Sequence, residues 1–143
     1  QGDFDLFLLA GRYTLLEQES LETCLPLLQK RGIGVVIGGA YNSGILATAP
    51  KPGAFFNYDP APPEILDRVA KIEAICKKHD IKLVQAALRF PLVHPVVACV
   101  IPGAARAEEI ALNMDTLGAK IPAALWADLK AAGLMRQDAP APA

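Results

Sequence analysis

The chain has 143 residues, of which 52% are hydrophobic, and it carries 14 basic against 15 acidic side chains. This length and composition fit one globular domain with a core of its own and exclude a disordered chain. The nearly balanced charge excludes the basic surface that binds nucleic acid or an anionic membrane. The expected partner is therefore a small molecule or another protein.

No apolar run is long enough to cross a membrane. The longest, Leu92 to Pro102, is interrupted by a histidine and a proline and falls short of the roughly 20 residues that a membrane helix needs. The N-terminus shows no signal-peptide pattern, and it starts at Gln1 rather than Met, which suggests a fragment or a processed chain. Three widely spaced cysteines in apolar surroundings predict buried free thiols rather than disulfides or a metal site, and they fit a reducing cytoplasm. They are Cys24, Cys76 and Cys99.

The first predicted element is a buried strand. Phe4 to Ala10 is almost wholly apolar without alternation, which is typical of a strand covered on both faces in a parallel sheet. Apolar residues at helical spacing after Ser20 predict a helix with Ser20 as its N-cap, and Gly32, which follows two basic residues, predicts its end. We expect Pro26 to bend the first turns of this helix.

A second buried strand is expected next. It covers Ile33 to Gly39, ends in glycines and leads into the polar turn Ala40 to Gly44. Residues Thr48 to Pro63 are rich in proline, glycine and aromatic side chains, and they predict a long irregular loop. Loops of this length in compact domains are usually functional or mobile, so we expect a lid or rim over a site here.

Helices and a third strand follow. An apolar stripe from Pro63 to His79 indicates a long amphipathic helix with the proline in its first turn. Leu83 to Phe90 is expected to be a shorter helix, and Val96 to Ile101 a third buried strand that ends at a Pro-Gly pair. Further helices are predicted from Ala107 and over Ala123 to Ala132.

Three strands that alternate with helices indicate an α/β fold with a parallel sheet. Such a sheet leaves an unpaired edge on each side, a liability that proteins normally cover or abolish by closure. The chain is therefore expected to belong to something larger. Residues 137–143 contain two prolines and are predicted to be flexible or to lie on the surface.

The segment from Val100 to Ile110 is the most informative for function. It is a predicted strand that passes through a turn of small residues into a helix, and such a turn presents backbone N–H groups and a positive helix end to phosphate. Arg106 lies at this turn and suits a phosphate or an adenine face. An ordinary strand-to-helix turn is the alternative for this segment taken alone.

Several motifs, in order along the chain, resemble those of the aldo-keto reductase family. Val100 to Ala104, together with Arg106 and Asn113, resembles the last barrel strand and the cofactor loop of that family. Phe4 to Leu16 resembles its sixth strand and exit loop, and Gly34 to Leu46 resembles its seventh strand and the loop that follows.

The resemblance extends over nearly the whole chain. Ala86 to Phe90, followed by His94-Pro95, resembles the helix before the eighth strand. Ala10 to Leu16 and Asn42-Ser43-Gly44 are most similar to the branch that contains D-threo-aldose, L-fucose and pyridoxal dehydrogenases. The resemblance implies an α/β fold in which residues 1–136 are the C-terminal part, about strands 6 to 8 with their helices, of a (β/α)8 TIM barrel. Residues 137–143 would then be a flexible tail, and the site would lie at the C-terminal ends of the strands.

A nicotinamide cofactor, NAD or NADP, is implied by the same resemblance. In the family the loop after the last strand wraps the adenosine phosphate, an Asn along the next helix contacts the adenine, and the loop after the seventh strand lies along the pyrophosphate. The candidate cofactor-binding residues are Ala40, Asn42, Ser43, Gly44, Leu46, Gly103, Ala104, Arg106, Glu109 and Asn113.

Two positions depart from the family pattern. Where many members place an Arg against the 2'-phosphate of NADP, this chain has Glu109, an anion that would repel phosphate and can accept from a ribose hydroxyl. Glu109 therefore favours NAD, although the neighbouring Arg106 offers the phosphate of NADP a partner. The family's Gln near the nicotinamide is replaced by Ala10.

The family's acid-base residues are expected outside this chain. Aldo-keto reductases use a Tyr acid tuned by Lys, Asp and usually His, all on the first four barrel units, which would precede Gln1. No catalytic residue and no metal ligand is therefore expected within 1–143. We expect structural or exposed histidines, tyrosines that border the cofactor or substrate, and a tryptophan in the core. These residues are His79, His94, Tyr13, Tyr41, Tyr58 and Trp126.

Two hypotheses follow from the sequence. The preferred one is a cytoplasmic fragment of an NAD(P)-dependent oxidoreductase that transfers hydride between nicotinamide and an aldehyde or aldose carbon, and that is inactive by itself. Its partners would be the cofactor and a small carbonyl or sugar substrate, with no nucleic acid or membrane. The rival is a non-catalytic half-barrel that acts by self-association or by pairing with a separate N-terminal half.

Overall fold

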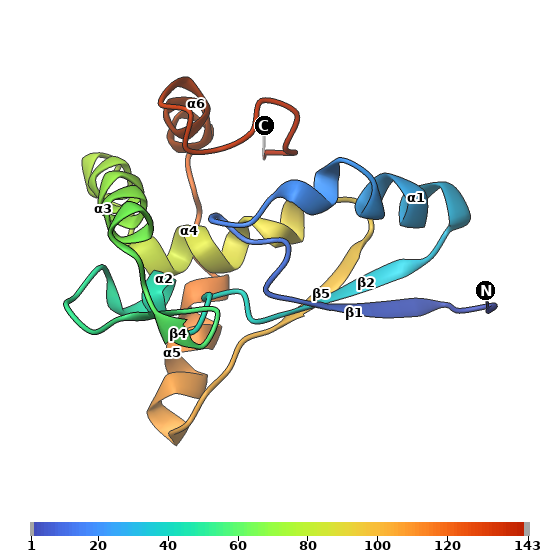
Figure 1. Ribbon diagram of the computed structural model, residues 1–143, viewed down its shortest axis with the longest axis horizontal. Coiled ribbons are helices and arrows are strands. Elements are labelled where there is room, and N and C mark those ends of the chain that lie inside the picture. Colours follow the sequence, from blue (N-terminus) through green and yellow to red (C-terminus); the bar gives the residue numbers. More distant parts are fainter. Residues whose placement is uncertain (1, 142–143) are drawn as a thin grey trace.

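The computed structural model describes residues 2–141, which form a three-stranded parallel sheet with helices packed against it (Figure 1). The strands are β1 (Leu6–Ala10), β2 (Gly34–Gly38) and β5 (Val97–Ile101), in the order β1-β2-β5. Both strand pairs are parallel. This arrangement confirms the predicted α/β fold with a parallel sheet.

The middle strand, β2, is the best covered. Val35 and Ile37 are fully buried, and the residues that alternate with them, Gly34, Val36 and Gly38, are half-buried. In Figure 1, α1 (Cys24–Arg31) and α4 (Leu83–Arg89) run along one side of the strands. A sheet covered on one face buries every second side chain, which is the pattern that β2 shows.

The prediction of buried strands, with cover on both faces for the first, is wrong for β1 and β5. Leu6 and Leu8 are 57% and 62% exposed, and Ile101 on β5 is also exposed. These two strands lie at the edges of the sheet, and each pairs with β2 alone among residues 2–141. The apolar sequence therefore describes strands that need more cover than this part of the chain supplies.

The helix predicted from Ser20 starts later than expected. A short 3-10 turn, Glu19–Leu21, precedes α1, and Thr23 rather than Ser20 occupies the N-cap position. Pro26 lies in the first turn of α1, where a missing N–H costs no helical hydrogen bond. Gly32 ends α1 in the left-handed conformation, as predicted.

The later helices agree with the sequence prediction within one or two residues. α3 (Pro63–Lys78) starts at its proline, and α4 is followed by the 3-10 turn Pro91–Val93. α5 (Ala107–Leu117) and α6 (Ala123–Ala131) complete the set. The fully buried Phe90, just after α4, packs its ring against those of Tyr13 and Trp126, so the expected core position of the tryptophan is confirmed.

The segment predicted as an irregular loop contains two small elements. β3 (Phe55–Phe56) and β4 (Asp59–Pro60) form a two-stranded antiparallel hairpin, and α2 (Ile45–Thr48) precedes it. Asn57 and Tyr58 form the two-residue turn with φ angles of 51° and 69°. Left-handed conformations at both central positions are characteristic of the tight turns that close hairpins.

The residues beyond α6 lie against it. The Gln137 side chain donates to the Lys130 carbonyl oxygen at 2.8 Å, and the Lys130 ammonium donates to the Gln137 carbonyl oxygen at 2.9 Å. Ala139 is buried, and Arg136 bonds to Glu22 at 2.7 Å. The flexibility proposed for 137–143 stays a prediction, and residues 142 and 143, like residue 1, lie outside the described part.

Three further expectations concern membranes, metals and thiols. Among residues 2–141, no helix has the length and apolar character needed to span a bilayer. No group of three or more His, Cys, Asp or Glu side chains within the same range is arranged to hold a metal ion. All three cysteines are free, but only Cys76 is buried as predicted. Cys24 is half-buried, and Cys99 is exposed because it lies on the uncovered strand β5.

Candidate functional site

The candidate site lies where the carboxyl ends of the strands meet. Because β1, β2 and β5 are parallel, the turns that follow them gather at one edge of the sheet. These turns begin at Gly11, Gly39 and Pro102. The residues that the sequence proposed for cofactor binding lie in two of these turns and in the helices that follow them, α2 and α5.

The turn after β2 is compact and rich in left-handed residues. Gly39, Asn42, Ser43 and Gly44 have φ angles of 63°, 45°, 57° and 93°. Glycine and asparagine tolerate this conformation well, which explains their presence here. The Asn42 N–H donates to the Gly39 carbonyl oxygen and the Gly44 N–H to that of Tyr41, both at 3.0 Å.

One side-chain hydrogen bond joins this turn to α5. The Tyr41 hydroxyl donates to Asn113 Oδ1 at 2.7 Å, and Asn113 Nδ2 donates to the Gly103 carbonyl oxygen at 3.4 Å. Both side chains are buried. Burial raises the pKa of Tyr41 to about 12, so its hydroxyl stays a neutral donor at physiological pH. The bond holds the turns after β2 and β5 at a fixed separation.

Two adjoining cavities lie along these turns. One, of about 270 Å³, is lined by the residues from Gly39 to Gly44 with Tyr58 and Gly103. The other, of about 340 Å³, extends from Tyr41 and Gly103 to residues of α5. Of the ten candidate residues, those that line one or both cavities are Ala40, Asn42, Ser43, Gly44, Gly103, Arg106, Glu109 and Asn113.

Two of the candidate residues lie elsewhere. The Leu46 side chain, on α2, is fully buried in the core, and its N–H donates to the Tyr41 carbonyl oxygen at 3.1 Å. Ala104 is exposed beside the second cavity but does not line it. The sequence analysis did not predict the Tyr41–Asn113 bond, because a contact between residues 72 positions apart leaves no local signal.

Glu109 and Arg106 form a bonded pair at the start of α5. Glu109 Oε2 accepts from the Ala105 N–H at 2.7 Å, while Oε1 accepts from Arg106 Nε at 3.1 Å. The Ala105 N–H and then the Arg106 guanidinium hold the pKa of Glu109 below its usual value. The carboxylate therefore stays charged and satisfies a free N–H at the helix N-terminus.

The histidines and the other tyrosines discussed from the sequence lie away from these cavities or only at their rim. His79 bonds to Asp128 at 2.9 Å between α3 and α6. His94 is buried against Tyr13, and burial lowers its pKa. Burial raises the pKa of Tyr13 beyond its normal range, whereas Tyr58 is 91% exposed at the rim of the first cavity.

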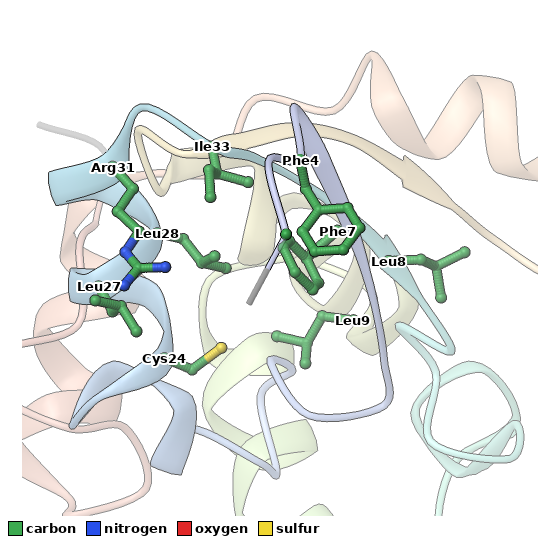
Figure 2. A pocket seen from close by; sticks show the side chains of 10 residues that line it. Phe4, Phe7, Leu8, Leu9, Cys24, Leu27, Leu28, Arg31 and Ile33 are labelled. Atoms are coloured by element: carbon green, nitrogen blue, oxygen red, sulfur yellow. The ribbon is translucent and has the colours of Figure 1, made fainter.

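A separate apolar cavity of about 320 Å³ lies between β1 and α1 (Figure 2). Its lining includes Phe4, Phe7, Leu9, Leu27 and Leu28, and Arg31 is the one charged residue in it. A small-molecule site normally adds a few converging polar groups to an apolar wall, and this cavity has almost none. It is better explained as an uncovered flank of the sheet.

Comparison with known proteins identifies the family. The sequence profile of the Aldo/keto reductase family matches residues 1–133. The chain belongs to this family. It is 40% identical over 136 residues to D-threo-aldose 1-dehydrogenase of a Pseudomonas species, and 43% identical over 136 residues to pyridoxal 4-dehydrogenase of Microbacterium luteolum. The predicted family and branch are therefore confirmed.

These matches cover the chain but only part of the relatives. Each includes 94% of this chain, yet 41% and 40% of the respective relative. A solved aldo-keto reductase of Bacillus halodurans superposes with a TM-score of 0.70 at 23% identity, over 95% of this chain and 45% of that one. The likeness confirms the predicted fold class, because the chain matches part of a TIM barrel. The chain spans about two fifths of the length of the curated relatives.

Proposed function

We propose that this chain is the cofactor-binding part of an NAD(P)-dependent oxidoreductase. The whole protein would transfer hydride between a nicotinamide and an aldehyde or aldose carbon. The family uses nicotinamide cofactors, and the two curated relatives are named as dehydrogenases of an aldose and of pyridoxal. When bound, the nicotinamide supplies or accepts the hydride, and the residues of this chain hold the cofactor in place.

The observation that carries this proposal is the pair of cavities between two bonded turns. A Cβ added at Gly44 or Gly103 would meet nothing within 4 Å, so both positions face open space that a ligand can fill. The buried Asn42 amide has no hydrogen-bond partner among residues 2–141. Open glycine backbone and an unpartnered amide fit a polar, extended ligand, so the residues present fit a dinucleotide.

Within this site, we assign the adenosine end to the cavity beside α5. Asn113 and Arg106 would border the adenine and its ribose, and the residues from Ala40 to Gly44 with Gly103 would lie along the diphosphate. NAD is favoured over NADP because the Arg106 guanidinium is already bonded to Glu109. The 2'-phosphate of NADP would have to compete with that carboxylate for the cation.

We further propose that the chain is inactive by itself. Tyr41 lines both cavities, but burial raises its pKa away from neutrality, whereas a general acid or base needs a pKa near the working pH. The purified chain, mixed with NAD and aldose sugars or with NAD(P)H and aldehydes, should show no turnover. Activity that persists after removal of any full-length enzyme would contradict this. Its free cysteines fit a cytoplasmic protein.

The cofactor assignment can be tested by filling the cavity. Gly103→Val places a branched side chain in open space between the two turns without a left-handed backbone to strain it. In the whole protein this change should weaken NAD binding at least about tenfold, as measured by calorimetric titration. Gly118→Val, at the C-cap of α5 with a φ of −72°, is the matched control. Equal affinity of the two variants for NAD would mean that the cofactor lies elsewhere.

A second candidate function is a non-catalytic half-barrel that acts by association. The exposed apolar side chains of β1 and the groove of Figure 2 favour it, because both are surfaces that another polypeptide can cover. That polypeptide would be a second copy of the chain or a separate N-terminal half. Failure of the whole protein to bind either NAD or NADP would make this the better proposal.

A further inference from the structure

A third cavity, of about 190 Å³, lies between the turns that follow β1 and β2. It shares Gly39, Asn42, Ser43 and Tyr58 with the neighbouring cavity, but no residue of α5 lines it. It is therefore the extension of the site on the side away from the proposed adenosine end. Neither its arginine, Arg12, nor the turn after β1 belongs to the cofactor-binding set described above.

Asn42 gives this cavity an unsatisfied polar group. Its side chain is only 2% exposed, and neither Oδ1 nor Nδ2 has a partner among residues 2–141. Buried amides are almost always hydrogen-bonded, since leaving them unpaired costs free energy. A ligand group that both donates and accepts, as a hydroxyl does, can satisfy the two atoms of such an amide.

Arg12 adds a cation at the rim. Its side chain is 61% exposed, and Nη1 donates to Glu17 Oε2 at 3.3 Å. Glu17 Oε1 accepts from Asn57 Nδ2 at 3.0 Å, which ties the hairpin turn to the same carboxylate. A guanidinium has five N–H donors, so most of those on Arg12 remain available to ligand oxygens.

We propose that Arg12 and Asn42 bind a pair of neighbouring hydroxyl groups on a sugar ring. Hydroxyl oxygens accept from the guanidinium and from the amide nitrogen, and a hydroxyl hydrogen satisfies the amide oxygen. The ring is either the ribose on the nicotinamide side of the dinucleotide or the sugar substrate, because both present the same chemistry. This inference rests on the proposed function, which brings both rings to this edge of the sheet.

The test uses the whole protein and three probes. ADP carries only the adenosine side, ADP-ribose adds the second ribose without nicotinamide, and L-fucose in the presence of NAD represents the sugar. Asn42→Gly removes the amide at a φ of 45° that glycine adopts freely, and Arg12→Gln removes the charge. Asp80→Gly, at a φ of 57° beyond α3, and Arg31→Gln on α1 are matched controls outside the cavity.

Calorimetric dissociation constants separate the outcomes. If the ring is the ribose, both variants should weaken the binding of ADP-ribose about tenfold more than they weaken that of ADP, a difference equivalent to about 1.4 kcal/mol. If the ring is the substrate, the variants should weaken the binding of L-fucose by a similar factor and leave the binding of ADP-ribose unchanged relative to ADP. Values for ADP-ribose and L-fucose that match those of the controls would overturn the inference. A wild-type protein that binds neither ADP nor NAD would instead refute the proposed cofactor function, and the L-fucose titration alone would then decide the cavity.

Discussion

At the scale of single residues, the Arg106–Glu109 pair would decide, in the proposed binding mode, between a ribose hydroxyl and a 2'-phosphate at the adenosine end of the cofactor. The carboxylate is held by the Ala105 N–H at 2.7 Å and by the guanidinium at 3.0 Å. The carboxylate offsets part of the charge of the guanidinium, so a 2'-phosphate would have to compete with it for Arg106. The sequence analysis predicted that Glu109 lies near the 2'-position of the cofactor, but it did not predict the bond between Glu109 and Arg106.

Reversing the charge of Glu109 should change the cofactor preference. In the whole protein, Glu109→Arg removes a repelling anion, frees Arg106 and adds a second cation, so the ratio of kcat/KM for NADP to that for NAD should rise about tenfold or more. The substitution also leaves the Ala105 N–H without its acceptor, which can lower kcat/KM for both cofactors. Such a shared decrease cancels in the ratio. Glu108→Arg, on the same helical turn, makes the same charge change and should alter the ratio less. An unchanged ratio in Glu109→Arg would mean that this position does not approach the ribose.

Residue-level prediction succeeded where a signal is local. Glycine, asparagine and serine in the turn after β2 predicted a tight backbone, and four of its residues have positive φ angles. The orphaned amide of Asn42 and the bond between Tyr41 and Asn113 depend on how distant segments pack. Neither leaves a pattern in the sequence around it.

At the scale of elements, periodicity and end signals predicted the strands and helices well. The predictions failed where the structure depends on packing between distant segments or where an element is very short. Ser20 has the chemistry of an N-cap, but a 3-10 turn intervenes before α1. The β3–β4 hairpin has strands of two residues, too short for any alternation to be seen. Burial of β1 and β5 was predicted wrongly, because burial depends on what covers a strand and not on its sequence alone.

The hairpin turn makes a separate prediction about Tyr58. This residue is 91% exposed and has a φ of 69°, so its ring gains little from burial while its backbone is strained. Tyr58→Gly should therefore raise the free energy of unfolding by up to about 1 kcal/mol, measured by denaturant titration of the whole protein. Tyr58→Ala removes the ring but keeps the strain and should bring no such gain. Loss of stability in Tyr58→Gly would show that the ring itself supports the turn.

At the scale of the whole molecule, the described part is a sheet with too little cover. Apolar side chains are exposed on β1, on β5 and on α5, and the groove between β1 and α1 adds a concave apolar surface (Figure 2). In a closed barrel each strand has two neighbours, so no edge remains. The match to part of a TIM barrel explains why β1 and β5 have the apolar sequences of buried strands although residues 2–141 leave them exposed.

The isolated chain should therefore self-associate or aggregate. Edge strands with free N–H and C=O groups and exposed leucines pair readily with other chains, and charged side chains on the edge oppose this. Light scattering of the purified chain should show species larger than a monomer at micromolar concentrations. The double variant Leu6→Lys/Leu8→Lys should reduce the apparent mass, whereas Phe55→Lys, at a similarly exposed position on the β3–β4 hairpin, should not. A wild-type chain that stays monomeric across this range would show that the open edges of the sheet do not drive association.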